Sequence, residues 1–398
     1  MSKKTATLQE HFDYFLKDFE PDPKPKVIWI DLGDGRRMTK TNSIKLPPNL
    51  QIYHPYIVFI ILAHLKKMPF LGRWEKVAWE IPIKYKEVPF ILAHRKFGFS
   101  ITANDEGEEI TNLGIELIRN IHKAIPYAEK LVEPDIKSLV QKREISIDNQ
   151  YSNILLRYQF FRENAKREFK RKNIGKNFKL NLKGSKQVAI KSYQKYLKLS
   201  NAKYYFVTAM LDAYFSLLEH TFVLLLPFVP TQLPEAINLE TFIGFNWKQK
   251  YKMLFPIAED KEALYLLEKL DRIKEDFRNP FSHGYLLKGG NSFYVHFSNL
   301  GAIPVTLTKS ERNFKYGFET KLHFTFDDIC ECFDEFDSYL RSSETTKYGM
   351  QYIKHELLIS FDNKSSKNYK KHMKSTRTFQ QYVERMIRLH DDAANMDW

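Results

Sequence analysis

The chain has 398 residues, of which 43% are hydrophobic, so it is long enough for two or three domains with their own cores. A formal net charge of +14 favours polyanionic partners, with nucleic acid ahead of an anionic membrane surface. Two cysteines exclude a disulfide framework, the apolar runs are too short to span a membrane, and no secretory signal is visible, so we expect a cytoplasmic protein that is not bound to a membrane.

Residues 1–145 mix strand and helix patterns and predict an α+β domain of unknown role. A hairpin is expected where an apolar run is followed by Gly33-Asp34-Gly35. The pattern then predicts a helix over 55–67, β structure over 88–103 and a helix from Glu108 that Pro126 ends or kinks.

Residues 146–200 are far more basic and predict a basic helical linker. Between Arg162 and Lys203 there are 14 Lys or Arg and two acidic residues, with Tyr193 and Tyr196 among them and Tyr204 directly after. Basic side chains contact phosphates and aromatic rings stack on bases, so the mixture suits RNA, although a solvated linker would look similar. The residues predicted to bind RNA are Lys166, Arg167, Lys170, Arg171, Lys172 and Lys176.

Residues 201–345 predict a helical bundle. A long buried helix is expected over Ala202–Phe228, ended by Pro227 and Pro230, with further helices over Asn246–Phe255 and Asp260–Asn279. A short strand around 293–297 and a last helix from Phe326 complete the segment.

Residues 346–398 predict a basic C-terminal helical extension. From Asn363 to Arg377 there are six Lys or Arg and no acidic residue, and an amphipathic helix follows from Phe379.

The end of the third predicted bundle helix carries the candidate chemistry. Pro280 cannot extend a helix and disfavours helical backbone at Asn279. In a continuous helix Arg278 and His283 would face about 140° apart, and a helix end removes that constraint. Both side chains can then face one pocket.

These residues resemble the signature of the HEPN superfamily, which is an Arg, a polar residue, a few further residues and a His. Arg278, Asn279 and His283 match it, the apolar helix around 215–220 looks like the family's first helix, and Trp247-Lys248-Gln249-Lys250 looks like the lead into its second. The resemblance covers about residues 200–340 and implies a mainly α fold with a HEPN-like up-down helical bundle, beside the separate α+β domain.

Spacing alone does not single out this pair. Arg385 and His390 have the same spacing, but they lie on a predicted tail helix without a bundle before it. A structural role at the helix end is the competing interpretation of Arg278 and His283, since both side chains can bond to terminal carbonyls.

The resemblance implies metal-independent RNA cleavage without a cofactor, in which the ribose 2′-hydroxyl attacks the adjacent phosphodiester to leave a cyclic phosphate and a 5′-hydroxyl. His283 would move the proton, Arg278 would stabilise phosphate charge, and Asn279 would orient the imidazole or contact the phosphate. Glu219 is a supporting candidate that could hold Arg278, and His220 is expected to be a hydrogen-bonded core residue. One His does not readily serve as both acid and base, so the resemblance implies a homodimer with a composite site.

We therefore expect an endoribonuclease that acts as a toxin or antiviral effector, with residues 1–145 receiving a trigger or regulatory partner; the role in defence follows the family analogy alone. Two alternatives remain open. The bundle could be a non-catalytic RNA-binding or assembly module, or a nucleotide-binding regulator in which Arg278 holds a phosphate.

Overall fold

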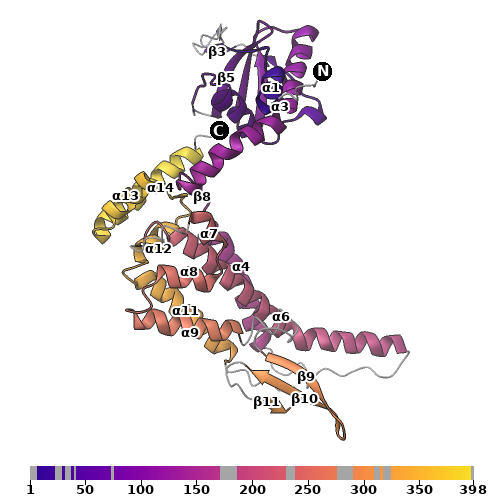
Figure 1. Cartoon of the computed structure of the whole chain (residues 1–398), viewed down its shortest axis with the longest axis vertical. Helices are drawn as coiled ribbons and strands as arrows, with labels where there is room; N and C mark the ends of the chain where they lie inside the picture. Colours follow the sequence, from indigo (N-terminus) through magenta and orange to yellow (C-terminus); the bar gives the residue numbers. More distant parts are fainter. Residues whose placement is uncertain are drawn as a thin grey trace, which may run out of the picture. The chain divides into compact units, whose positions relative to one another are not determined.

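The computed structural model describes most of the chain, in ten segments. They are residues 7–22, 29–31, 37–39, 42–72, 76–170, 186–229, 238–275, 290–308, 314–316 and 324–395. The chain divides into an N-terminal unit, Met1–Leu139 with Arg388–Trp398, and a helical unit, Val140–Ile387. The predicted mainly helical class is confirmed (Figure 1).

The N-terminal unit is built on a five-stranded antiparallel sheet of order β1-β5-β6-β7-β4. Alternate residues of β5, from Val77 through Ile81 and Ile83 to Tyr85, are buried, as expected for a sheet with one covered face. The strands are β1 Phe19–Pro21, β4 Asn42–Ser43, β5 Val77–Tyr85, β6 Val88–Arg95 and β7 Gly98–Ala103.

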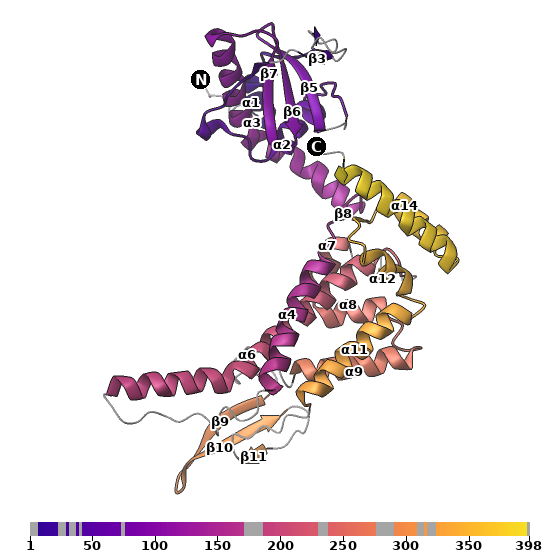
Figure 2. The same ribbon diagram turned by 180° about the vertical axis from the view of Figure 1, so that it is seen from behind.

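Helices cover that face of the sheet (Figure 2). They are α1 Leu8–Phe15, the single turn η1 Pro48–Leu50, α2 Pro55–Phe59 with its π-helical continuation η2 Ile60–Leu65, and α3 Glu108–Gln141. The predicted helix over 55–67 and the helix start at Glu108 are confirmed, as is the hairpin, whose strands β2 Trp29–Asp31 and β3 Arg37–Thr39 pair antiparallel.

The prediction that Pro126 could end α3 is wrong, because this helix runs through both Pro126 and Pro134. An internal proline costs a helix about 3 kcal/mol or more. Burial of Ala124, Ala128 and Val132 on the same helix offsets that cost.

The helical unit surrounds one large apolar core. Its helices are α4 Tyr151–Lys170, α6 Lys186–Leu225, α7 Leu239–Gly244, α8 Trp247–Leu254, α9 Lys261–Ile273, α11 Phe326–Ser342, α12 Lys347–Ile353, α13 Asn363–His372 and α14 Thr376–Asn395, the last of which runs on past Ile387. Its strands form the antiparallel pair β8 Ser146–Ile147 with β12 Ile359–Ser360, and the antiparallel sheet β9 Gly290–Phe297, β10 Gly301–Thr308 and β11 Phe314–Tyr316.

The predicted start of the first bundle helix at Ala202 is wrong, because α6 already begins at Lys186, within the predicted linker. The other three predicted bundle helices begin close to the expected residues. α8 has an Asn246 capping box, α9 is capped by Asp260, and α11 has a Thr325 capping box with Asp328. The predicted strand around 293–297 lies within β9. Among the described residues, no helix combines the length and apolar character that crossing a membrane requires.

The predicted linker over 146–200 is wrong for its first part. Tyr151, Tyr158 and Ala165 of α4 are buried in the core of the helical unit. The C-terminal extension is likewise part of this core from α12 through Phe379 and Val383 of α14. Each of these segments has a narrow apolar stripe under a strongly basic exterior, and the charge concealed the stripe.

A polar network fixes α4 and α6 against α11. The Tyr214 ring stacks on Phe333 with centroids 3.7 Å apart, and its hydroxyl donates to the Asp337 carboxylate at 3.0 Å. Arg162 donates to both carboxylate oxygens of Asp334 at 2.5 and 2.6 Å. This network sets the position of α4, and with it the positions of Lys166 and Lys170 on that helix.

Candidate functional site

The expected catalytic residues lie just past the described part of α9. The helix continues as a π turn to Glu275, whereas Arg278, Asn279 and His283 lie outside the described residues. The second match, Arg385 and His390, is exposed on the continuous helix α14, and His390 Nδ1 lies 3.7 Å from an Asp391 carboxylate oxygen. Residues five apart on such a helix face different directions, so this pair does not form one site.

The last described turn of α9 is anchored by aromatic rings. Lys274 Nζ lies 4.9 Å from the ring centre of Phe215 and 5.3 Å from that of Trp247. Cation–π contacts of this kind contribute about 0.5–2 kcal/mol each. They hold the last described turn of α9 against α6 and α8.

Glu219, the predicted supporting residue, holds α6 to the start of α8. Its Oε1 accepts a hydrogen bond from the Trp247 backbone N–H at 3.3 Å, which satisfies a donor that a helix start leaves unpaired. Glu219 also faces Lys250, whose pKa is lowered by burial and partly restored by the Glu219 charge. The predicted pairing of Glu219 with Arg278 concerns a residue outside the described part.

His220 is hydrogen-bonded within the helical unit. Its Nε2 accepts from the backbone N–H of Gln150 at 3.0 Å, and burial lowers the pKa of the imidazole. Because an accepting nitrogen carries no proton, His220 is neutral and serves to join α6 to the start of α4. This agrees with the expectation of a hydrogen-bonded core histidine.

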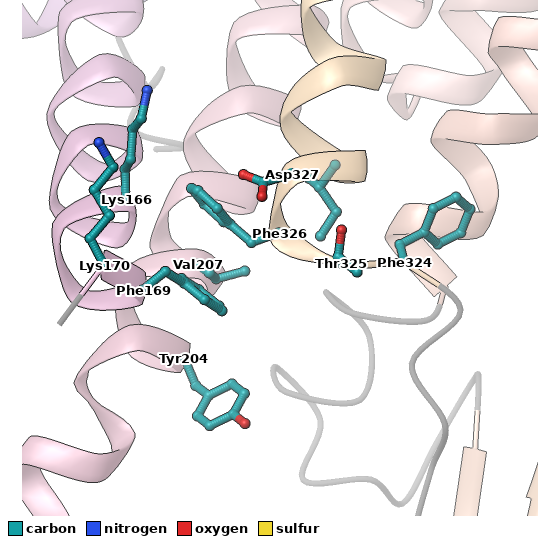
Figure 3. A pocket seen from close by; sticks show the side chains of 10 residues that line it. Lys166, Phe169, Lys170, Tyr204, Val207, Phe324, Thr325, Phe326 and Asp327 are labelled. Atoms are coloured by element: carbon teal, nitrogen blue, oxygen red, sulfur yellow. The ribbon is translucent and has the colours of Figure 1, made fainter. Parts of the chain in front are cut away.

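A cavity of about 510 Å³ opens between α4, α6 and the start of α11, and we call it the aromatic cavity (Figure 3). Its size is in the range of small-molecule sites, about 300–1,000 Å³. Its described lining residues are Lys166, Phe169, Lys170, Tyr204, Val207, Phe324, Thr325, Phe326, Asp327 and Ile329.

The apolar part of the aromatic cavity is a stacked pair of rings. Phe169 of α4 and Phe326 of α11 lie with centroids 4.7 Å apart and an interplanar angle of 13°. Lys203 Nζ lies 5.6 Å from the Phe169 ring centre and 4.8 Å from that of Tyr204. A flat aromatic ligand would have to stack on an outer side of this pair, since the facing sides of the two rings already contact each other.

The basic part of the cavity comes from the predicted RNA-binding residues. Lys166 and Lys170 are exposed on α4 at a spacing that places them beside Phe169 on one helix face, and Figure 3 shows their side chains extending in the same direction. Neither lysine has a carboxylate within ion-pair distance among the described residues. Arg167 is also exposed, while Arg171, Lys172 and Lys176 lie outside the described residues.

The start of α11 adds polar groups to the same cavity. Thr325 and Asp328 form the capping box, and hydrogen bonds from Thr325 lower the pKa of Asp328. Asp327 lines the cavity and can accept hydrogen bonds from amino groups of a base. The arrangement offers stacking, phosphate neutralisation and an acceptor within one space.

Sequence reasoning found only one wall of this cavity. Lys166, Lys170 and Tyr204 were singled out by charge and aromatic content. Phe326 and Asp327 come from a distant segment that was predicted only as a helix start, and Phe324 was given no role. Nothing in the local pattern of either segment indicates that they meet.

Comparisons with protein-family models, characterised proteins and solved structures give no match to this chain, so its function is argued from its own residues.

Proposed function

We propose that this chain is a metal-independent endoribonuclease of the HEPN type whose helical unit binds single-stranded RNA at the aromatic cavity. The observation that carries the proposal is that Lys166 and Lys170 flank the stacked rings of Phe169 and Phe326. Proteins that hold single-stranded nucleic acid combine cations along the backbone path with rings on which bases stack.

Cleavage is assigned to the residues that follow α9. Arg278 would bind the phosphate that accumulates charge, His283 would transfer the proton, and Asn279 would orient the imidazole or contact the phosphate. The contacts of Lys274 with Phe215 and Trp247 hold the last described turn of α9, which precedes Arg278 in the sequence. A second copy of the chain would supply the other histidine in a composite site.

Cleavage is tested with purified full-length protein and total RNA, in parallel with His283→Ala. The wild type should yield fragments that end in a cyclic phosphate and begin with a 5′-hydroxyl, at an unchanged rate when a metal chelator is added. The variant should lose at least about 100-fold in rate, the usual size of a general acid–base contribution. Equal cleavage by both proteins rejects the assigned site.

Binding is tested separately on the His283→Ala background. Lys166→Gln with Lys170→Gln should weaken binding of a single-stranded RNA and reduce the salt slope by about 1.4, which is 0.7 for each phosphate contact. Phe169→Leu should weaken binding by about 1–3 kcal/mol without changing that slope. Phe160→Leu is the matched control, since Phe160 is exposed on α4 and does not line the cavity.

A second candidate function is RNA binding without cleavage. The aromatic cavity favours it, because stacking and phosphate contacts need no catalytic residue. It predicts tight, salt-sensitive binding in both wild type and His283→Ala and no fragments from either. The cleavage assay separates the two functions.

A further inference from the structure

A second cavity, of about 400 Å³, lies where the end of α11, α12 and the start of α14 meet, and we call it the basic cavity. All of its lining residues belong to the helical unit. Its described lining residues are Arg341, Lys347, Tyr348, Met350, Gln351, Lys354, His355 and Thr376, and no carboxylate is among them.

The positive charges of the basic cavity are only partly neutralised. Lys347 pairs with Glu344, whose side chain is 84% exposed. The Lys347 Nζ also lies 5.0 Å from the Tyr348 ring centre. Arg341 and Lys354 have no carboxylate within ion-pair distance among the residues that the structure describes. Arg341 acts at longer range on Asp337, whose pKa it lowers against the larger effect of burial.

The helix dipoles account separately for the position of each of these two cations, Arg341 and Lys354. Arg341 is in the last turn of α11 and Lys354 follows the last residue of α12, positions where a cation is favourable. The dipoles do not require that cations from separate helices line one concave space. Like charges so placed repel one another, and a bound anion removes that repulsion.

The start of α14 adds a further attraction for anions. Ser375 caps this 20-residue helix through its Oγ, which accepts from the Thr378 N–H at 3.3 Å, and Thr376 in the first turn lines the cavity. The first N–H groups of a helix lack intrahelical partners and carry partial positive charge. Three cationic side chains, His355 and the first residue of α14 therefore line one space.

We propose that the basic cavity binds a phosphate group. The neighbouring sequence is also positively charged, since residues 363–377 hold six Lys or Arg and no acidic residue. The phosphate can belong to an RNA backbone or to a free phosphate compound, and both present the same oxygens to Arg341, Lys354 and the start of α14. The site is separate from the aromatic cavity and does not depend on cleavage.

The test uses full-length His283→Ala protein, with the double substitution Lys354→Gln and His355→Gln added. Both residues are exposed, so the variant should fold, which far-ultraviolet circular dichroism and thermal melting check. Lys252→Gln is the control, because Lys252 is exposed on α8 and lines neither cavity. One probe is a 20-nucleotide single-stranded RNA measured by fluorescence anisotropy, and the other is inorganic pyrophosphate measured by calorimetry.

If the site takes RNA, the double variant should bind the oligonucleotide about 5–10-fold more weakly, and its salt slope should fall by about 0.7 for each phosphate that the variant no longer neutralises. If it takes a free phosphate compound, pyrophosphate binding should fall by a similar factor while RNA binding equals that of the control. Equal binding of both probes by the double variant and the control overturns the proposal. The RNA affinity of Lys166→Gln with Lys170→Gln reports on the aromatic cavity independently, so failure here is distinguishable from failure of the aromatic cavity.

Discussion

Asp337 is a buried carboxyl group of the helical unit whose pKa lies above its ordinary value. Burial raises its pKa to about 6, against hydrogen bonding from Tyr214 and the charges of Arg341 and Arg162. A carboxyl group with a raised folded-state pKa binds a proton more tightly when folded. Its contribution to stability is therefore present at low pH and is lost as pH rises towards and through about 6.

Asp337→Asn should accordingly gain stability relative to the wild type as pH rises from about 4 to 7. The amide oxygen can still accept a hydrogen bond from the Tyr214 hydroxyl, and the variant avoids a buried charge at pH 7. The free energies of unfolding of variant and wild type should therefore diverge by an amount on the order of 2 kcal/mol over this range. Urea unfolding at several pH values measures it. Asp260→Asn should instead differ from the wild type by a nearly constant amount over this range, with the difference shrinking only as pH falls below 3.8, because hydrogen bonds from Ala263 and Tyr339 lower the pKa of Asp260. A flat profile for Asp337→Asn would contradict this account.

Asp260 also allows a prediction on helix capping. Its Oδ1 accepts from the Ala263 N–H at 3.0 Å, and its Oδ2 accepts from the Tyr339 hydroxyl at 2.8 Å. Asp260→Ala removes both bonds and should destabilise the protein by about 1–3 kcal/mol. Glu259→Ala removes an exposed neighbouring carboxylate and is the control for charge. Similar denaturation midpoints for the two variants would rule out the capping role.

At the scale of elements, the close packing of α12 against the end of α6 depends on a glycine. A Cβ on Gly349 would lie 2.6 Å from Leu225 Cδ2 and 3.1 Å from Phe228 Cβ. Leu225 can turn its methyl group away, whereas Phe228 is buried and its Cβ is fixed by the backbone.

Gly349→Ala should therefore destabilise the protein by about 1–3 kcal/mol through overpacking, although alanine ordinarily favours a helix. Gly244→Ala is the matched control, since nothing lies within 4 Å of a Cβ placed there. Thermal melting of the two variants makes the comparison. A Gly349→Ala variant as stable as Gly244→Ala would show that α12 can move away from Phe228.

Periodicity and apolar runs predicted the longer bundle helices, α3 and part of the N-terminal sheet, whereas α1, α7, β1, β4, β10, β11 and β12 were not predicted. The start of α11 followed from the acidic residues of its first turn, and β6 and β7 followed from their apolar runs. β5 was not predicted, and it contains Pro82, a residue that is uncommon in a central strand. The Pro82 carbonyl accepts a hydrogen bond from the Asp22 backbone N–H, just beyond the end of β1. The nitrogen and carbonyl of one strand residue point to the same side, so the Pro82 nitrogen faces the side on which β1 has already ended.

The candidate site was harder to predict than the elements that carry it. Charge identified Lys166 and Lys170, because a local surplus of lysine is visible in a single stretch of sequence. The ring that stacks on Phe169 comes from Phe326, and only tertiary packing of α4 against α11 brings the two together. The Arg162–Asp334 pair and the Tyr214–Asp337 bond that set this packing also join distant segments.

At the scale of the whole molecule, the account requires two copies of the chain for cleavage. One His283 transfers one proton at a time, so a composite site needs a second histidine. Excess His283→Ala protein mixed with wild type should then suppress cleavage, because mixed dimers lack one histidine. Wild-type activity that stays constant across the titration would contradict the shared site, and sedimentation analysis would show whether mixed dimers form.

The most direct test of the central claim is an RNA cleavage and binding assay on three full-length proteins: wild type, His283→Ala, and Lys166→Gln with Lys170→Gln. The account predicts that the wild type cleaves RNA, that His283→Ala binds RNA with wild-type affinity but does not cleave it, and that the lysine variant binds more weakly with a smaller salt slope and cleaves less at low RNA concentration. Undiminished cleavage by His283→Ala, or undiminished binding by the lysine variant, would contradict it.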